Sequence, residues 1–117
     1  MLSDPKDAAF LFEMHRILGE IAELVGGEVR EDFLADRFKP DALAVRFLLL
    51  GEATNRISRD TWALHPRIEW QKIAKLRHLI AHEYRKIDHG ELWKIATTEA
   101  PLLSRSLPVP PSPKDVF

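Results

Sequence analysis

Residues 70–87 read WQKIAKLRHLIAHEYRKI, and their apolar positions recur at the spacing of three or four residues that is typical of a helix. One side of that helix would carry four branched aliphatic residues: Ile73, Leu76, Ile80 and Ile87. Such a stripe predicts a helix that opens at Trp70 and packs this side against a core. No stretch of the sequence alternates apolar and polar residues in the manner of a β-strand. The sequence therefore predicts an all-α fold.

Two helices are expected before residue 40. The first follows Ser3 or Asp4, which can cap it, and ends at Gly26-Gly27, because glycine adopts the left-handed C-cap conformation freely. A short helix is expected over about residues 30–37, because Lys39-Pro40 prevents it from continuing.

The next helix is expected to be capped by Asp41 and to run to about Arg59. It is apolar on more than one side, which is typical of a central position in a bundle. Gly51 lies inside it, where glycine is about 1 kcal/mol less favourable than alanine. We therefore expect another backbone to approach closely at Gly51. Glu52, Asn55 and Arg56 are polar on this otherwise apolar helix, and they are either solvated or support a site.

Residues 61–68 are expected to form a loop around Pro66. After the helix that opens at Trp70, the pattern Asp88-x-x-Glu91 is a capping box and predicts a last helix, which Pro101 should kink or end early. These features predict one domain over residues 1–106. A proline-rich extended tail over residues 107–117 is expected to add nothing to the core.

The composition is that of an ordinary globular domain, with 117 residues, 45% of them hydrophobic and 30% charged. The longest apolar run, residues 47–50, is far shorter than the roughly 18 residues of a membrane span. The N-terminus lacks the layout of a signal peptide. Cysteine is absent, which excludes disulfides and thiolate metal sites. A cytoplasmic location without membrane association is expected.

Charge is unevenly distributed along the chain. Residues 67–86 carry a net charge of +4, and the remainder carries −5. Four of the five histidines lie in or beside this segment: His65, His78, His82 and His89. A local basic patch on a nearly neutral protein suits a small anionic target, although a solvated helix face is the alternative interpretation.

The basic segment contains Arg77, His82 and Tyr84 within eight residues. The arginine side chain fits phosphate oxygens, and histidine exchanges protons near neutral pH. On a straight helix, at about 100° per residue, Arg77 and Tyr84 point nearly the same way, whereas His82 points roughly 140° from Arg77 and lines up with His78. Arg77 and His82 can therefore meet at one phosphate if the helix is distorted or if two copies face each other. We favour a symmetric dimer.

Three interpretations of this cluster remain open from the residues alone. In a ribonuclease, His82 would act as general base or acid and Arg77 would stabilise the pentacoordinate phosphate, without a metal. In a zinc site, His78 and His82 would be the pair of ligands four residues apart, with His89 or Glu52 recruited as a third. In a purely structural role, Arg77 would pair with a carboxylate and the histidines would be solvated.

The spacing Arg77-x4-His82-x-Tyr84 resembles the R-x4-H-x-Y signature of HEPN-domain proteins, specifically the HepT-like toxin branch. The blocks that flank it, at residues 50–53, 68–70, 87–88 and 92–93, resemble the same branch in order and spacing. The resemblance extends from about Lys6 to Leu103.

This resemblance implies an antiparallel bundle of about five helices that forms a homodimer, with the motifs lining a shared cleft. It implies a metal-independent endoribonuclease without cofactors, cleaving an RNA such as tRNA or mRNA, that serves as the toxin of a toxin–antitoxin pair. The partner implied is a minimal nucleotidyltransferase antitoxin. The alternative within the same superfamily is a noncatalytic subunit that assembles with a nucleotidyltransferase.

The resemblance also implies roles for individual residues. Arg77 and His82 match the catalytic pair, and His78 fills a position that binds phosphate or orients the others. Tyr84 matches the tyrosine that the antitoxin modifies with AMP. Glu52 matches a supporting position to which the resemblance assigns no role.

Overall fold

The computed structural model of the chain describes residues 4–110. Within that range every regular element is helical, which confirms the all-α prediction. The elements are α1 (Asp7–Val25), α2 (Arg30–Ala35), α3 (Lys39–Arg56), α4 (Arg59–Leu64), α5 (Trp70–Glu83), the 3₁₀ turn η1 (Tyr84–Lys86), α6 (His89–Thr97) and α7 (Glu99–Ser106). None of the helices among these residues is both long and apolar enough to cross a bilayer.

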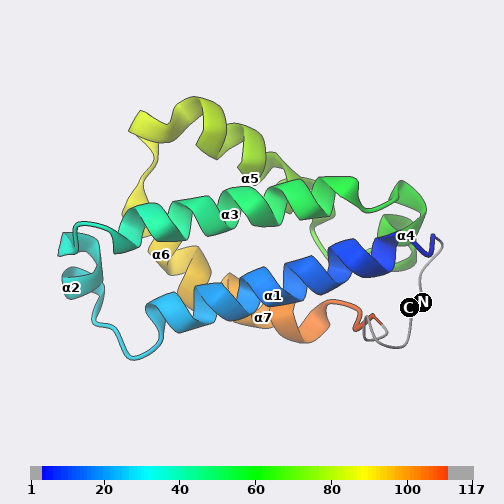
Figure 1. Cartoon of the computed structure of the whole chain (residues 1–117), viewed down its shortest axis with the longest axis horizontal. Helices are drawn as coiled ribbons and strands as arrows, with labels where there is room; N and C mark the ends of the chain where they lie inside the picture. The colour runs from blue at the N-terminus through cyan, green and yellow to red at the C-terminus, as the bar shows by residue number, and fades with distance from the viewer. Residues whose placement is uncertain (1–3, 111–117) are drawn as a thin grey trace.

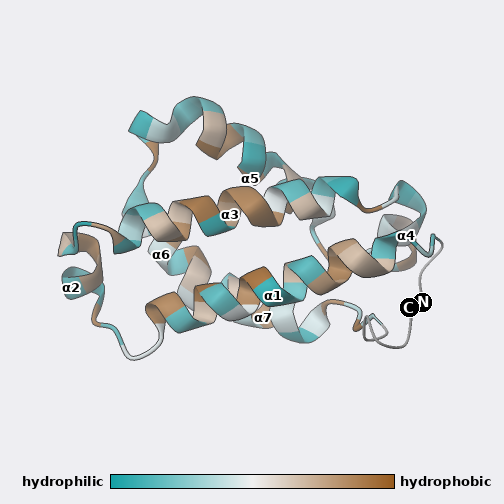
Figure 2. Ribbon diagram, viewed as in Figure 1, coloured by the Kyte–Doolittle hydropathy of each residue, from teal (hydrophilic) through white to brown (hydrophobic). Residues whose placement is uncertain are grey.

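The central element is α3, as its apolar pattern predicts. It packs most extensively against α5 on one side and against α1 on the other, and each of these pairs runs antiparallel (Figure 1). α6 and α7 cover α1 on the face that lies behind it in Figure 1. In Figure 2 the apolar residues of α1 and α3 form stripes, whereas the projecting end of α5 is hydrophilic.

The core is formed mainly by α1 and α3, with smaller contributions from the other helices. Its largest fully buried apolar side chains are Phe33, Phe47, Leu11, Met14, Ile17, Ile21, Leu43, Leu50 and Ile57. From α5, Trp70 and Ile80 are buried, while Ile73 and Leu76 are half-buried against the core. α5 is therefore a peripheral helix that presents most of its surface to solvent.

The backbone of α5 approaches α3 closely at Gly51, in agreement with the prediction. A Cβ atom added to Gly51 would lie 2.6 Å from the backbone nitrogen of Arg77 and 3.0 Å from the carbonyl oxygen of Ile73. Real Cβ atoms do not approach backbone atoms so closely, so glycine is required for this packing distance.

The start of α3 differs from the prediction. The helix begins at Lys39 rather than after Asp41, because Pro40 is accommodated in the first turn, where its missing N–H group is not needed. The carboxylate of Asp36 accepts hydrogen bonds from the backbone N–H groups of Phe38 and Lys39, at 2.8 and 2.9 Å. Asp36, rather than Asp41, therefore satisfies the backbone donors at this end.

The loop predicted over residues 61–68 is wrong in its first half, where α4 forms. Ser58 is the N-cap, and its hydroxyl oxygen accepts from the backbone N–H of Thr61 at 3.3 Å. The buried carboxylate of Asp7, from the start of α1, accepts from the backbone N–H of Ser58 at 2.9 Å and from the Thr61 hydroxyl at 2.5 Å. This helix thus depends on a residue far away in the sequence.

The C-terminal helix is divided into α6 and α7, and together with α4 this gives the described chain seven α-helices instead of about five. Asp88 caps α6 as predicted, accepting from the N–H of Glu91 at 3.2 Å. The helix ends at Thr97, and Pro101 lies in the first turn of α7, where proline is tolerated.

The expectation that nothing from residue 107 onward joins the core is wrong for its first residue. Leu107 is buried in the core, and the carbonyl oxygen of Pro108 lies 2.9 Å from Nε2 of His15. The rest of the predicted tail, residues 111–117, and Ser3, one of the two expected caps of α1, lie outside the described residues. Asp4 does not cap α1, which begins at Asp7; its carboxylate instead accepts from the N–H of Lys6.

The close contact at Gly51 can be tested by adding one methyl group. We expect Gly51→Ala to lower the free energy of unfolding by about 1–3 kcal/mol, because α5 must move away from α3. Gly19→Ala is the matched control, since a Cβ atom there meets nothing within 4 Å. It should leave stability unchanged or raise it by up to about 1 kcal/mol. Urea denaturation measures both; equal stability of the two variants would show that the contact at Gly51 imposes no constraint.

Candidate active site on α5

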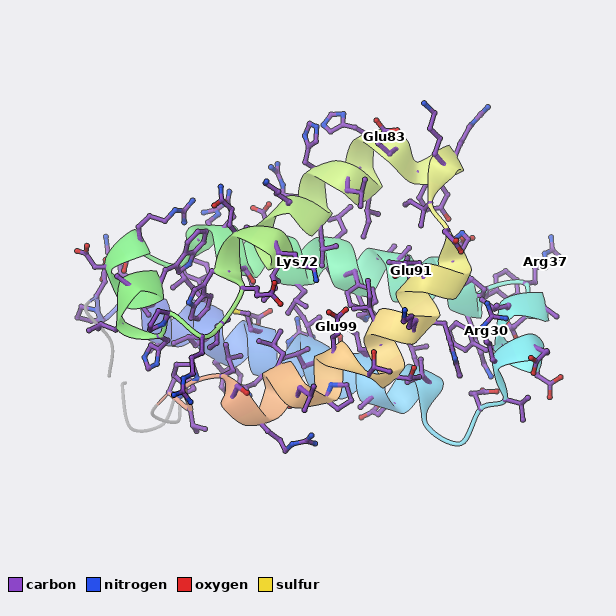
Figure 3. All side chains as sticks on the ribbon, turned by 180° about the vertical axis from the view of Figure 1, so that it is seen from behind. Arg30, Arg37, Lys72, Glu83, Glu91 and Glu99 are labelled. Carbon is purple, nitrogen blue, oxygen red and sulfur yellow. The ribbon has the colours of Figure 1, made fainter. Side chains whose placement is uncertain are left out.

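The second half of α5 is exposed on nearly all sides. Ile80 is its last buried residue, and residues 81–86 are all exposed. Figure 1 shows this end of α5 extending beyond the bundle and away from α1, and Figure 3 shows Glu83 at its tip. The helix ends at Glu83, and the 3₁₀ turn η1 leads to α6. The residues of the motif therefore lie on a helix end that the rest of the chain does not cover.

Arg77 points from α5 toward α3 and forms an ion pair with Glu52 through its Nε atom. The other carboxylate oxygen of Glu52 accepts from Nε of Arg56 at 3.3 Å. Glu52 thus lies between two arginines, one on its own helix and one on α5. The Arg77 side chain is 55% exposed, so the pair orients the guanidinium while leaving it open to a ligand.

His78 and His82 are exposed and lie one turn apart, with ring centroids 4.4 Å from each other. His78 also lines a surface depression together with Arg77. It therefore lies between the two residues that the motif pairs. Among residues 4–110, no group of three or more His, Cys, Asp or Glu side chains is placed to hold a metal ion.

Tyr84 lies in η1, is 42% exposed, and donates a hydrogen bond from its hydroxyl group to the Asp41 carboxylate at the start of α3. This hydrogen bond stabilises the neutral phenol and raises the pKa of Tyr84 above its usual value; desolvation and the negative charge of Asp41 act in the same direction. Arg77 and Tyr84 both reach α3, but their partners, Glu52 and Asp41, are separated by about 16 Å along that helix.

Two functional candidates in the structure, Asp41 and Lys75, were missed by the sequence analysis. Asp41 was assigned to helix capping, which hid its contact with Tyr84. Arg56, which the sequence left either solvated or supporting a site, is the second partner of Glu52, and their spacing of four residues on one helix is typical of such a pair. Lys75 shares a helix face with His78 and His82, because it precedes them by three and seven residues.

The family model described as "Ribonuclease HepT-like" matches residues 14–108, a range that contains the whole motif. The chain belongs to the HepT-like ribonuclease family.

Several curated relatives of this HepT-like chain are named as ribonucleases. A protein of Thermococcus cleftensis named "Probable ribonuclease HepT" is 33% identical over 90 residues, covering 74% of this chain and 82% of the relative. A protein of Methanocaldococcus jannaschii named a "Putative RNase" is 24% identical over 101 residues, covering 86% and 93%. Another with that name, from Caldanaerobacter subterraneus, is 26% identical over 87 residues, covering 74% and 78%. No solved structure matches this chain.

The contact between Tyr84 and Asp41 can be tested by titration, because Tyr84 is the one tyrosine in the chain. We expect Asp41→Asn to lower the pKa of Tyr84 toward about 10, the value of an unperturbed phenol. Tyrosinate absorbance against pH measures this directly, with Asp32→Asn as the control.

The contact between Tyr84 and Asp41 also makes the stability of the fold depend on pH. The hydrogen bond raises the pKa of Tyr84 in the folded state. Its contribution to the free energy of unfolding is therefore fully present below pH about 10, the pKa of an unperturbed phenol, and is lost as the pH rises through the pKa of folded Tyr84. An unchanged titration in Asp41→Asn would show that the carboxylate does not hold the phenol in solution.

Proposed function

We propose that this HepT-like chain is a metal-independent endoribonuclease that acts in the cytoplasm as the toxin of a toxin–antitoxin pair. The observation that carries this proposal is the exposure of the motif on α5, with His78 in ring contact with His82 and lining the same depression as Arg77. The ion pair of Arg77 with Glu52 and the exposed histidines are also what the purely structural interpretation predicts. Membership of the HepT-like ribonuclease family favours the nuclease over that interpretation.

The chemistry requires a base, an acid and a cation beside one phosphodiester. One His82 imidazole accepts the proton of the 2′-hydroxyl group, and the 2′-oxygen attacks phosphorus. Arg77 stabilises the negative charge that develops on the pentacoordinate phosphate. The same His82 imidazole, protonated by this step, donates the proton to the leaving 5′-oxygen, and the bond between that oxygen and phosphorus breaks. The products are a 2′,3′-cyclic phosphate and a free 5′-hydroxyl group.

A homodimer would bring Arg77 and His82 to the same phosphate, because their side chains diverge within one chain. Arg77 points toward α3, whereas the His82 ring lies against His78. The exposed end of α5, which includes Leu79 with 48% of its surface accessible, is available to a second copy. A two-fold axis at this end would place the arginine of one subunit near the histidine of the other.

Tyr84 is the proposed site at which a minimal nucleotidyltransferase attaches AMP. The phenol oxygen would attack the α-phosphorus of ATP, the bond to pyrophosphate would break, and Asp41 is placed to accept the phenol proton. Since Tyr84 follows His82 by two residues and its partner Asp41 lies far from Glu52, the adduct would be closer to His82 than to Arg77 of the same subunit. The adduct would block the proposed dimer cleft on the side of His82.

Purified protein should cleave RNA in the presence of EDTA, and His82→Ala should lower the rate by about 100- to 10,000-fold, which is the usual contribution of a general acid or base. His82 is exposed, so the free energy of unfolding should change by less than about 0.5 kcal/mol. His15→Ala, on α1, is the control for loss of an imidazole elsewhere. Gel analysis of a labelled RNA, with thermal melting of each variant, measures both effects.

Two results would contradict this mechanism. Cleavage that is lost in EDTA and restored by zinc would favour a metal site that includes His78 and His82. Absence of cleavage by the wild-type protein, together with stable binding to a nucleotidyltransferase, would favour the noncatalytic subunit.

A mixing experiment tests whether Arg77 and His82 act across the dimer. Arg77→Ala and His82→Ala are each expected to be inactive, but a mixed dimer would contain one site with both groups intact. Random assembly gives about half mixed dimers, so about a quarter of the wild-type activity should return. If both groups came from the same subunit, no mixture would regain activity. A tandem-linked pair of the two variants provides the same test with fixed stoichiometry.

A further inference from the structure

A polar depression lies between the end of α3, α4 and the first half of α5, next to Arg77 and His78. Its volume is about 520 Å³, within the range of sites for small ligands. The charged side chains in its lining are Arg59, Lys75 and Arg77, and none of the described residues that line it is acidic. A depression with this lining attracts anions.

Arg59 is held in a fixed position without losing its charge. Its guanidinium carbon lies 3.8 Å from the centre of the Trp62 ring. Its terminal nitrogens donate to the carbonyl oxygens of Asn55 and Ile57, at 3.3 and 3.0 Å, and to the amide oxygen of Asn55 at 3.1 Å. All these acceptors are uncharged, so the cation is oriented but not neutralised, unlike Arg77 with its carboxylate partner.

The Trp62 ring packs against one face of the Arg59 guanidinium. The same ring lies parallel to that of Trp70, with an interplanar angle of 4° and 6.1 Å between centroids. Trp70 is buried and donates from Nε1 to the carbonyl oxygen of His65 at 2.9 Å. The guanidinium of Arg59 is thus the outer layer of a rigid stack. Guanidinium planes and aromatic rings are the surfaces on which proteins stack unpaired bases of RNA.

Lys75 connects this stack to the motif. On α5 it shares a face with Gln71, His78 and His82, and it precedes His82 by about 10 Å along the helix axis. Among residues 4–110, Lys75 has no ion-pair partner. Lys72, three residues earlier, points instead toward α7 and pairs with Glu99 at 3.2 Å (Figure 3). Of these two lysines on one helix, Lys75 is the one that lines the depression.

We infer that this depression is an RNA-binding subsite that holds a nucleotide next to the cleaved linkage. The inference rests on the proposed ribonuclease function for the identity of its ligand. Lys75 binds the phosphate that follows or precedes the scissile one, and a base stacks on the Arg59–Trp62 layer. The side chains of Asn55 and Gln71 line the same depression and offer amide groups to the edge of that base.

The test uses a short 2′-O-methyl oligoribonucleotide, which lacks the nucleophilic hydroxyl group and is not cleaved. Lys75→Ala should weaken its binding by about 5- to 30-fold and lower the salt dependence of log K by about 0.7, the contribution of one phosphate contact on a single strand. Lys72→Ala is the matched control and should change the affinity by less than about twofold. Fluorescence anisotropy at four salt concentrations gives both quantities.

Arg59→Ala should weaken binding of the same oligonucleotide by about 5- to 100-fold, because it removes both the charge and the stacking surface. Arg105→Ala, on α7, is the control for the loss of an exposed arginine. An abasic oligonucleotide should show a smaller difference between wild type and Arg59→Ala, since it has no base to stack. Circular dichroism confirms that each variant is folded.

The outcomes separate this inference from the proposed function. If Lys75→Ala and Arg59→Ala bind and cleave RNA like the wild-type protein, the subsite is overturned while the nuclease stands. If the wild-type protein cleaves nothing but binds the oligonucleotide through these two residues, the nuclease fails and the subsite stands. Binding of free AMP without binding of RNA would overturn the subsite as an RNA site.

Discussion

The close approach of α3 and α5 at Gly51 is the constraint on which the rest of the structure depends. With no side chain at this position, the backbone of α5 lies directly against that of α3 at Ile73 and Arg77. The next residue on α3, Glu52, can therefore reach the Arg77 guanidinium. Because the helices are antiparallel, the same contact brings the start of α3 to the end of α5, where Asp41 meets Tyr84. One missing methyl group thus sets the positions of two functional side chains.

Packing at Gly51 also explains why the motif is accessible. α5 is attached to the bundle through its first half and through Ile80, while its last three residues and the following turn have no buried side chain. In a bundle whose core is formed mainly by α1 and α3, an uncovered helix end contributes little to stability. It can therefore carry polar residues that the core would not accept, such as the His78–His82 pair.

Much of this arrangement could be predicted from the sequence, because the signals were local. The unfavourable glycine in an apolar helix predicted the contact at Gly51, and the spacing of Arg77 and His82 predicted that their side chains diverge. The cap at Asp88 was predicted correctly for the same reason. The dimer and the roles of the motif residues stay predictions.

The failures involve tertiary contacts. α4 forms where a loop was expected, since Ser58 and Thr61 are held by Asp7, about fifty residues earlier in the chain. The depression that contains Arg59 and Trp62 depends on this helix, so no reading of local pattern would have found it. Asp41 was misassigned because an aspartate near a proline is a common helix cap, and its contact with Tyr84 arises from the antiparallel pairing of two helices.

The pairing of Glu52 with both Arg56 and Arg77 bears on how an anion enters the site. A phosphate that binds the open side of the Arg77 guanidinium comes close to Glu52, and a carboxylate with no other partner would repel the incoming negative charge. Arg56 provides a second partner on the same helix, at 3.3 Å, so Glu52 keeps an ion pair when Arg77 is occupied. Both pairs are exposed, and such pairs are individually weak. A polyanion such as RNA therefore competes with Glu52 at little cost, while in its absence Glu52 keeps the Arg77 guanidinium oriented.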